Sequence, residues 1–323
     1  MIVITGGSGF IGSTLANTLV DEEILIVDTF SNNFQHQLLN NSGNVRLINL
    51  SNCKEVLQFY KNNIKYFYHL GANSSTDQSN LSETVNLNIF WSQYFWDFCV
   101  NNEIPFVYAS SAATYGDGSN GFSDTMTIDQ LKNIKINGLY GWSKMYFDIF
   151  ALNQASKKFA PPKWYGLKFF NVYGANEIHK GTQSSVIHPF LKQLIEYKKV
   201  YLFKSYVKNI QNGEQKRDFV SVNFCIEFIE KLLNLNSDNG IYNVGTGSPK
   251  TFIEFSKDIM NAAGIDGLIE YIDMPEKLKS HYQYFTKSEN KKSSKIHKEM
   301  NKFHYKKDLN NILETLMKSY DDE

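Results

Sequence analysis

A tyrosine and a lysine four residues apart are the side chains of this sequence best suited to proton transfer. Tyr140 and Lys144 stand in the stretch Tyr-Gly-Trp-Ser-Lys. On a helix, side chains at i and i+4 lie on one face, so the phenol and the ammonium would be neighbours. A free phenol has a pKa near ~10, and a fixed positive charge lowers it by stabilising the phenolate. We expect Tyr140 to exchange protons and Lys144 to lower its pKa, although such a pair also occurs on ordinary helices.

The residues after this pair predict the required helix. Phe147, Ala151 and Ala155 continue its apolar face, whereas Asp148 and Lys157 fall on other faces.

A serine before this helix is a candidate partner for the phenol. The apolar run 105–109 predicts a strand, and hydroxyl residues that include Ser111 follow it. In open parallel sheets, ligands bind beyond the carboxyl ends of the strands. Ser111 is therefore expected to share a proton with Tyr140; a serine that only caps a helix is the alternative.

The N-terminal segment predicts a dinucleotide site. An apolar run at 1–5 predicts a strand buried on both faces, and three glycines at three-residue spacing follow it before a helical pattern. Such glycines make a tight turn and let the backbone approach a diphosphate at the helix N-terminus. A second strand, 24–27, ends in an acidic residue placed to bind the adenosine ribose. The cofactor contacts expected here are Gly6, Gly9, Phe10, Ile11, Gly12, Asp28 and Thr29.

Two further strands are predicted at 45–50 and 66–70. The second leads into Leu70, Gly71 and Ala72, where small residues allow the cofactor to lie close to the backbone.

The composition points to a small-molecule partner. With 33 basic and 33 acidic side chains among 323 residues, the net charge of zero gives no grip on nucleic acid or an anionic membrane. No apolar run reaches the roughly 18 residues of a membrane span. We also expect no secretion signal, because the first residues predict a strand and not a charged region followed by an apolar one. The 3 cysteines form no Cys-x-x-Cys pair and indicate neither disulfides nor zinc. We expect a cytoplasmic protein without a metal.

Together these segments resemble the extended short-chain dehydrogenase/reductase superfamily, whose members act on nucleotide sugars. Within it, the chain is most similar to the family of ADP-L-glycero-D-manno-heptose 6-epimerases. The narrower similarity rests on the segments 104–116, 139–144, 169–181, 216–220, 241–247 and 275–286.

The resemblance implies an NADP-type cofactor that takes a hydride from C6 of the heptose and returns it to the other face of a transient ketone. The two epimers present their hydroxyls to opposite walls of the pocket, so two proton-transfer groups are needed. The family pattern assigns these roles to Tyr140 and Lys180, and makes Lys144 a cofactor ligand. A lysine that holds a phosphate or a carboxylate is the alternative reading of Lys180.

The resemblance also carries over individual contacts. A guanidinium at Arg217 can clamp a diphosphate with two hydrogen bonds, and a buried ion pair with Asp218 is the alternative. The implied cofactor contacts are Asn88 and Val172, and the implied substrate contacts are Asn171, Thr182, His188, Phe203, Lys204, Ser205, Arg217 and Tyr282.

Four departures from the family pattern bear on specificity. Residues 29–44 contain no Lys or Arg, which favours NAD over NADP because a ribose 2'-phosphate needs a cation. Asn49 stands where an aspartate usually touches the adenine. Pro189 occupies the place of a substrate-contacting histidine, which the adjacent His188 is expected to replace. The loop 206–215 is longer than usual, which leaves the base and the sugar open.

Several other functions share this fold. A 4,6-dehydratase carries Asp-Glu where this chain has Ala112-Ala113, and a hexose 4-epimerase has no need of Lys180. An epimerase or reductase for GDP-heptose or a hexose stays open. A non-catalytic nucleotide sensor would not need Tyr140 and Lys144.

The alternation of strands and helices predicts an α/β fold: a Rossmann-type doubly wound parallel sheet with a smaller, interleaved C-terminal substrate domain. The cofactor domain is predicted at 1–170, with returns near 214–245, and the substrate domain mainly at 171–323. The aromatic stripe at 90–98 is expected in the core or at a subunit interface, and the resemblance implies a homo-oligomer. Helices are predicted at 184–197, 252–263 and 309–320, strands at 200–203 and 269–272, and a solvated lysine-rich face at 287–307.

Overall fold

The computed structural model describes residues 1–30, 44–74, 80–279, 282–300 and 302–321. The chain forms two compact units that interleave in sequence. Unit 1 comprises Met1–Asp117, Asp124–Phe169 and Asn236–Asn243, and unit 2 comprises Gly118–Ser123, Phe170–Leu235 and Val244–Glu323.

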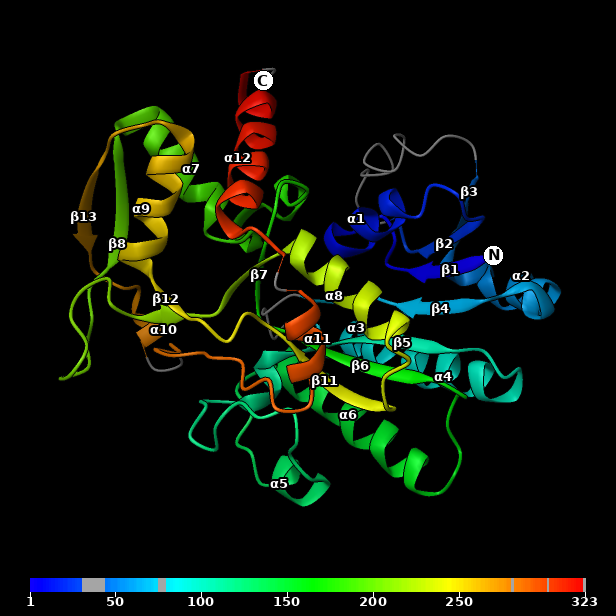
Figure 1. Ribbon diagram of the computed structural model, residues 1–323. Helices are drawn as coiled ribbons and strands as arrows, with labels where there is room; N and C mark the ends of the chain where they lie inside the picture. The colour runs from blue at the N-terminus through cyan, green and yellow to red at the C-terminus, as the bar shows by residue number, and fades with distance from the viewer. Residues whose placement is uncertain (31–43, 75–79, 280–281, 301, 322–323) are drawn as a thin grey trace. The chain divides into compact units, whose positions relative to one another are not determined.

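Unit 1 is built on a seven-stranded sheet in the order β11-β6-β5-β4-β1-β2-β3 (Figure 1). The pairs from β3 to β6 are all parallel. The order reverses between β1 and β4, which makes the carboxyl ends of these strands the expected ligand site. The doubly wound parallel sheet predicted from the sequence is confirmed. Its strands are β1 (Ile2–Thr5), β2 (Ile24–Asp28), β3 (Val45–Asn49), β4 (Tyr66–His69), β5 (Phe106–Ser111), β6 (Trp164–Phe169) and β11 (Gly240–Val244).

The helices of unit 1 connect these strands. A π-helical turn, η4 (Asn86–Phe90), joins the helices α3 (Leu81–Val85) and α4 (Trp91–Asn101) into one longer helical segment. Such turns are frequent at functional sites. The other helical elements are α1 (Phe10–Thr18), η2 (Leu50–Asn52), α2 (Cys53–Tyr60), η3 (Lys61–Asn63), η5 (Ala112–Tyr115), α5 (Ile128–Lys132) and α6 (Leu139–Ser156).

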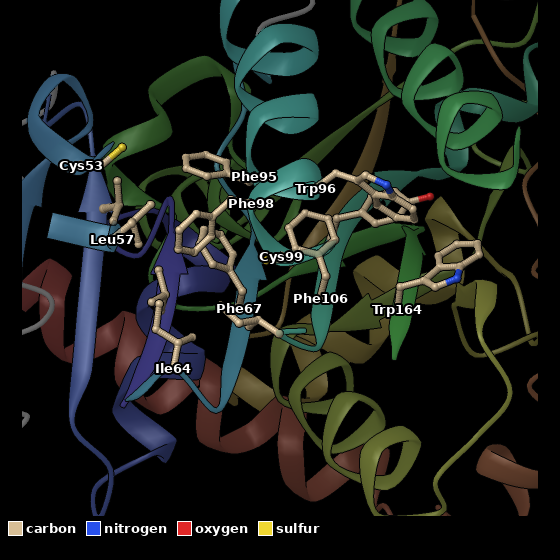
Figure 2. Close-up of a cluster of buried hydrophobic side chains, with 14 of the residues drawn as sticks. Cys53, Leu57, Ile64, Phe67, Phe95, Trp96, Phe98, Cys99, Phe106 and Trp164 are labelled. Carbon is tan, nitrogen blue, oxygen red and sulfur yellow. The ribbon is translucent and has the colours of Figure 1, made fainter. Parts of the chain in front are cut away.

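Aromatic side chains fill the core between this sheet and the helices α2, α4 and α6 (Figure 2). Phe67 of β4 lies 5.0 Å from Phe95 of α4 and 5.8 Å from Phe106 of β5, measured between ring centroids. Trp96 packs edge-on against Trp164 of β6 at 5.4 Å. The predicted stripe at 90–98 therefore belongs in large part to the core, and it fixes α4 against the strands.

Unit 2 combines helices with three two-stranded sheets, which pair β10 with β7, β12 with β9 and β13 with β8. Its core includes Tyr173, Leu191 and Leu313, and the rings of Phe219 and Phe255 stack at 4.1 Å. The strands are β7 (Asn171–Tyr173), β8 (Lys199–Phe203), β9 (Lys216–Arg217), β10 (Phe219–Ser221), β12 (Lys250–Thr251) and β13 (Leu268–Ile272). The helical elements are η6 (Ile178–Gln183), α7 (Ile187–Tyr197), α8 (Val222–Asn234), α9 (Phe252–Ala263), α10 (Glu276–Lys279), α11 (Ser294–Glu299) and α12 (Tyr305–Asp321).

The helices of unit 2 begin where their polar residues find partners. The helix predicted at 252–263 is α9, because Thr251 and Glu254 form a capping box and Gly264 ends it at a φ of 64°. The helix predicted from 184 begins instead at 187, since the Glu177 carboxylate accepts hydrogen bonds from Ser185. The helix predicted from 309 begins earlier, at 305.

Two classes of feature are missing from the described ranges. No helix there is long and apolar enough to cross a membrane. Nor do those residues hold a group of three His, Cys, Asp or Glu side chains that could bind a metal ion.

Candidate active site

The glycine turn between β1 and α1 leaves no room for side chains. Gly6 has a φ of 66°, and a Cβ built there would lie 2.4 Å from the Cα of Gly71. A Cβ on Gly12 would lie 2.2 Å from the carbonyl oxygen of Gly6. The N-cap of α1 is Gly9, which offers no side-chain cap, and the first turn of this helix contains no acidic residue. Uncapped N–H groups at a helix N-terminus suit a diphosphate.

Asp28 ends β2 beside this turn. Its carboxylate accepts hydrogen bonds from the backbone N–H groups of Ser8 at 3.1 Å and Phe30 at 3.3 Å. The predicted ribose ligand is therefore tied to the glycine turn. Asn49, at the end of β3, caps η2 and donates to the carbonyl oxygen of Thr29 at 3.2 Å. The rest of the predicted specificity segment, 31–43, lies outside the described residues.

The segment after β4 is bonded to the helix that carries the tyrosine. Asn88, in the π-helical turn, donates to the carbonyl oxygen of Asn73 at 3.0 Å and to the Ser143 hydroxyl at 2.9 Å. Ser143 in turn donates to the carbonyl oxygen of Tyr140 at 2.8 Å. The predicted cofactor residues Leu70, Gly71 and Ala72 are half-buried in this segment.

Ser111 and Tyr140 meet as predicted. Ser111 is the last residue of β5, and its side chain hydrogen-bonds the phenol of Tyr140. Its oxygen also accepts the Ala113 N–H at 3.1 Å, so the capping alternative holds as well. Gly141 permits this approach, because a Cβ there would lie 3.1 Å from the carbonyl oxygen of Ala113.

The electrostatics of this pair differ from the sequence prediction. Burial raises the pKa of Tyr140 above its ordinary value, and the hydrogen bond with Ser111 acts in the opposite direction. The prediction of a lowered pKa at Tyr140 is therefore wrong, because the effect of burial is the larger one. The Lys144 ammonium, 5% exposed, instead donates to the carbonyl oxygen of Ala109 at 2.8 Å. Its own pKa falls to about 8 because it is buried.

Asp148 is also not where the sequence pattern placed it. The prediction assigned it to a different face of the helix from Tyr140, but it is fully buried. It lies four residues after Lys144, hence on the same face one turn further along. Its carboxylate pairs with the Lys168 ammonium at 2.6 Å. The i, i+4, i+8 spacing of Tyr140, Lys144 and Asp148 could have predicted that Asp148 lies on the same face of the helix.

In unit 2, a buried glutamate holds the predicted second proton-transfer group. The Lys180 ammonium lies 3.2 Å from a carboxylate oxygen of Glu177, which is 1% exposed. The same carboxylate accepts hydrogen bonds from the N–H of Gly174 at 3.1 Å and from the hydroxyl of Ser185 at 2.6 Å. The alternative reading, in which Lys180 pairs with a carboxylate, thus describes one of its contacts. The Glu-x-x-Lys spacing could have predicted Glu177, which sequence reasoning missed.

His188 lies deeper than its proposed role suggested. It is 5% exposed, and its Nε2 donates to the carbonyl oxygen of Gly174 at 2.9 Å. Burial lowers its pKa, so the ring is neutral near pH 7. Its role as a substrate ligand in place of a histidine at Pro189 stays a prediction.

Arg217 is a buried cation surrounded by aromatic rings. It is 8% exposed, and its guanidinium carbon lies 5.1 Å from the ring centre of Tyr282 and 5.7 Å from that of Phe252. The alternative ion pair with Asp218 does not form among the described residues. The Asp218 carboxylate instead accepts N–H groups of Thr246, Gly247 and Ser288.

The other predicted substrate contacts divide into two groups. Phe203 packs edge-on against Tyr282 at 6.3 Å, so Phe203, Arg217 and Tyr282 form one cluster. Lys204 and Ser205 follow Phe203, and Lys204 pairs with Asp273 at 3.1 Å. Asn171 accepts a hydrogen bond from Thr286 at 3.1 Å. Val172, which was predicted as a cofactor contact, follows Asn171 in β7 and pairs with Val220 of β10. The side chain of Thr182 lies outside the described part of the structure.

The sequence is similar to that of a known protein family. The model of the NAD dependent epimerase/dehydratase family matches residues 2–245. The chain belongs to this family. Among its curated relatives, the ADP-L-glycero-D-manno-heptose-6-epimerase of Fusobacterium nucleatum is 36% identical over 307 residues, which cover 92% of each chain. The enzyme of the same name from Nitratidesulfovibrio vulgaris is 35% identical over 293 residues, 89% of each chain.

Solved structures of other epimerases share the fold. The ADP-L-glycero-D-manno-heptose-6-epimerase of Helicobacter pylori aligns with a TM-score of 0.79 and 24% identity, over 98% of this chain and 96% of its own. The UDP-glucose 4-epimerase of Thermotoga maritima, solved with UDP-glucose, aligns with a TM-score of 0.80 and 20% identity, over 99% of both chains.

Proposed function

We propose that this chain is a nucleotide-sugar epimerase that inverts C6 of ADP-D-glycero-D-manno-heptose and supplies heptose for the lipopolysaccharide core. The observation that carries the proposal is that each unit holds one candidate proton-transfer group: Tyr140, hydrogen-bonded to Ser111, in unit 1, and Lys180, bonded to Glu177, in unit 2. Inversion at C6 through a ketone turns the two hydroxyls toward opposite walls of the pocket, so each epimer needs its own proton-transfer group. The names of the curated relatives support the same substrate.

The residues of unit 1 fit a nicotinamide dinucleotide. The glycine turn, in which an added Cβ would clash at Gly6 and Gly12, lets a diphosphate approach the backbone. Asp28 is placed for the adenosine ribose, and Lys144 is assigned to the nicotinamide half of the cofactor. When bound, the cofactor supplies the reversible hydride acceptance that oxidation at C6 requires.

Tyr140 exchanges the proton of one epimer. Its raised pKa keeps the phenol neutral at pH 7, so it can donate a proton to the ketone oxygen during re-reduction. Oxidation runs in the opposite direction and needs the phenolate as a base. The hydrogen bond with Ser111 stabilises that phenolate, because it acts to lower the pKa.

Lys180 exchanges the proton of the other epimer. The ion pair with Glu177 holds its ammonium ready to donate to the ketone oxygen. We propose that Arg217 binds the substrate diphosphate, since a buried guanidinium without a carboxylate among the described residues lacks a counter-charge.

We also propose that NAD is the preferred cofactor. A carboxylate at Asp28 repels a ribose 2'-phosphate, and residues 29–44 offer no cation to bind one. A cytoplasmic location and a homo-oligomer follow from the proposed reaction and from the family resemblance; sedimentation of the purified protein tests the second.

Incubation with ADP-D-glycero-D-manno-heptose and NAD tests the proposal. Proton NMR should show the C6 epimer accumulating until both are present, while C4 keeps its configuration. The Tyr140→Phe variant, which keeps the ring, is the matched control and should leave the sugar unchanged. An unchanged C6 ratio with wild-type protein, or inversion at C4 of a UDP-hexose instead, would contradict the proposal.

A further inference from the structure

A buried ion pair in unit 1 joins the segments that carry Ser111 and Tyr140. Asp148 of α6 is fully buried, and Lys168 of β6 is 2% exposed. Besides the 2.6 Å contact with Lys168, the Asp148 carboxylate accepts hydrogen bonds from the hydroxyls of Tyr108 at 3.0 Å and Ser110 at 2.8 Å. Two strands, β5 and β6, and one helix, α6, therefore meet at one carboxylate.

The lysine of this pair reaches the turn after Ser111. Its ammonium donates to the hydroxyl of Thr114, which donates to the carbonyl oxygen of Ser111 at 2.7 Å. The same ammonium lies 4.8 Å from the ring centre of Tyr115, whose hydroxyl donates to Asn243 of β11 at 2.6 Å. The backbone of Ser111 is thus connected to the ion pair through the side chain of Thr114.

The two residues that precede Ser111 in β5 are both bonded to α6. Ala109 accepts the Lys144 ammonium, and Ser110 donates to Asp148. The sheet makes space for Tyr108, the other hydroxyl donor to Asp148. Gly166 of β6 faces the Tyr108 ring, and a Cβ on Gly166 would lie 2.4 Å from the Tyr108 hydroxyl oxygen. Tyr140, Lys144 and Asp148 share one face of α6, so the carboxylate anchors the face that carries the phenol.

Stability does not explain such a pair. Replacing a buried ion pair by apolar residues of similar size is often neutral or stabilising, whereas removing one partner leaves an uncompensated charge. We propose that Asp148 and Lys168 are positioning residues of the epimerase reaction, which hold the Ser111 turn and the Tyr140 face of α6 in register.

The charge of Asp148 also acts on Lys144. The carboxylate raises the pKa of Lys144, against the larger lowering effect of burial. The other titratable groups around Lys144 are Tyr140, on the same helix, and His69 of β4. His69 stays neutral because burial and Lys144 lower its pKa to about 3. Asp148 therefore helps to keep Lys144 charged near neutral pH.

The double variant Asp148→Asn/Lys168→Met tests the role, since it removes both charges together. We expect it to fold and bind cofactor, but with kcat lowered about 10- to 100-fold and KM little changed, as small misplacements of catalytic groups cost rate. The exposed pair Lys65 and Glu22, at 2.8 Å, supplies the matched control, Glu22→Gln/Lys65→Met. A folded double variant with wild-type kcat would overturn the proposal. If the double variant does not fold, Tyr108→Phe takes its place: a lowered kcat supports the proposal, and a wild-type kcat overturns it.

The kinetic test rests on the proposed function, because it uses the proposed substrate. The titration of Lys144 is a second readout that needs no substrate. Lysine labelled with carbon-13 at Cε lets the titration of Lys144 be followed by NMR, with assignment by Lys144→Arg. Its midpoint should fall in Asp148→Asn and stay in place in Glu22→Gln. An unmoved midpoint in folded Asp148→Asn would remove Asp148 from this role, whereas an inactive wild-type protein with a moved midpoint would contradict the proposed function alone.

Discussion

Replacing Lys144 with methionine should remove a pH-dependent cost that the buried ammonium imposes on the folded state. Burial lowers the pKa of Lys144 from 10.5 to about 8, so the unfolded chain binds the proton more tightly than the folded one. The folded state is therefore destabilised at every pH below about 8. The penalty fades as the pH rises from about 8 to about 10.5, because the unfolded lysine then also loses its proton.

The magnitude follows from these two pKa values. At ~1.4 kcal/mol per pKa unit, the shift lowers the free energy of unfolding by about 3 kcal/mol at pH 7 and by about 1.5 kcal/mol at pH 9.5. Lys144→Met also leaves the carbonyl oxygen of Ala109 without its 2.8 Å hydrogen bond. That loss, about 1–3 kcal/mol, does not depend on pH. The stability difference between the two proteins should therefore change by about 2 kcal/mol between pH 7 and pH 9.5.

Urea unfolding of both proteins without cofactor, at pH 7 and pH 9.5, measures this change. The free energy of unfolding of Lys144→Met, relative to that of the wild type, should be higher at pH 7 than at pH 9.5. Lys65→Met, which removes a lysine that is 59% exposed, is the control and should show no such dependence. If the difference between wild type and Lys144→Met were the same at both pH values, the ammonium would not be buried in the way described.

Three further outcomes are expected. Tyr140→Phe should lower kcat by about 10²- to 10⁴-fold with the cofactor still bound, whereas Tyr146→Phe, on an exposed part of the same helix, should not; near-normal turnover in the first would end the assigned role. Lys180→Met should slow epimerisation by a similar factor, and Lys192→Met, at an exposed pair, should not; an unaffected rate would return Lys180 to a binding role. Titration should show NAD binding more tightly than NADP, and the reverse order would contradict the reading of residues 29–44.

Local patterns were enough to predict the parts of the site that lie on single elements. The helical spacing of Tyr140 and Lys144 and the strand that ends in Ser111 each depend on only a few neighbouring residues. Asp28 could be placed for the same reason, since it closes a strand next to a glycine turn. These features survive in the structure because the parallel sheet brings the carboxyl ends of its strands to one edge.

The remaining features depend on contacts between distant segments. Asp148 was predicted on another face of its helix, because its buried partner, Lys168, lies 20 residues later in the chain and no local pattern connects the two. The pKa of Tyr140 was predicted from one neighbouring charge, but burial by the whole unit decides its direction. Arg217 is surrounded by Tyr282 and Phe252 from other parts of the chain, and no local pattern places those rings around it.

The most direct test of the central claim is the fate of the hydrogen on C6. ADP-D-glycero-D-manno-heptose carrying deuterium at C6 should yield the C6 epimer with its deuterium retained, because the cofactor returns the same hydride that it removed. Mass spectrometry and proton NMR of the product, formed in ordinary water, measure the retention. Loss of the deuterium to solvent during inversion would contradict transient oxidation at C6 and the roles given to Tyr140 and Lys180.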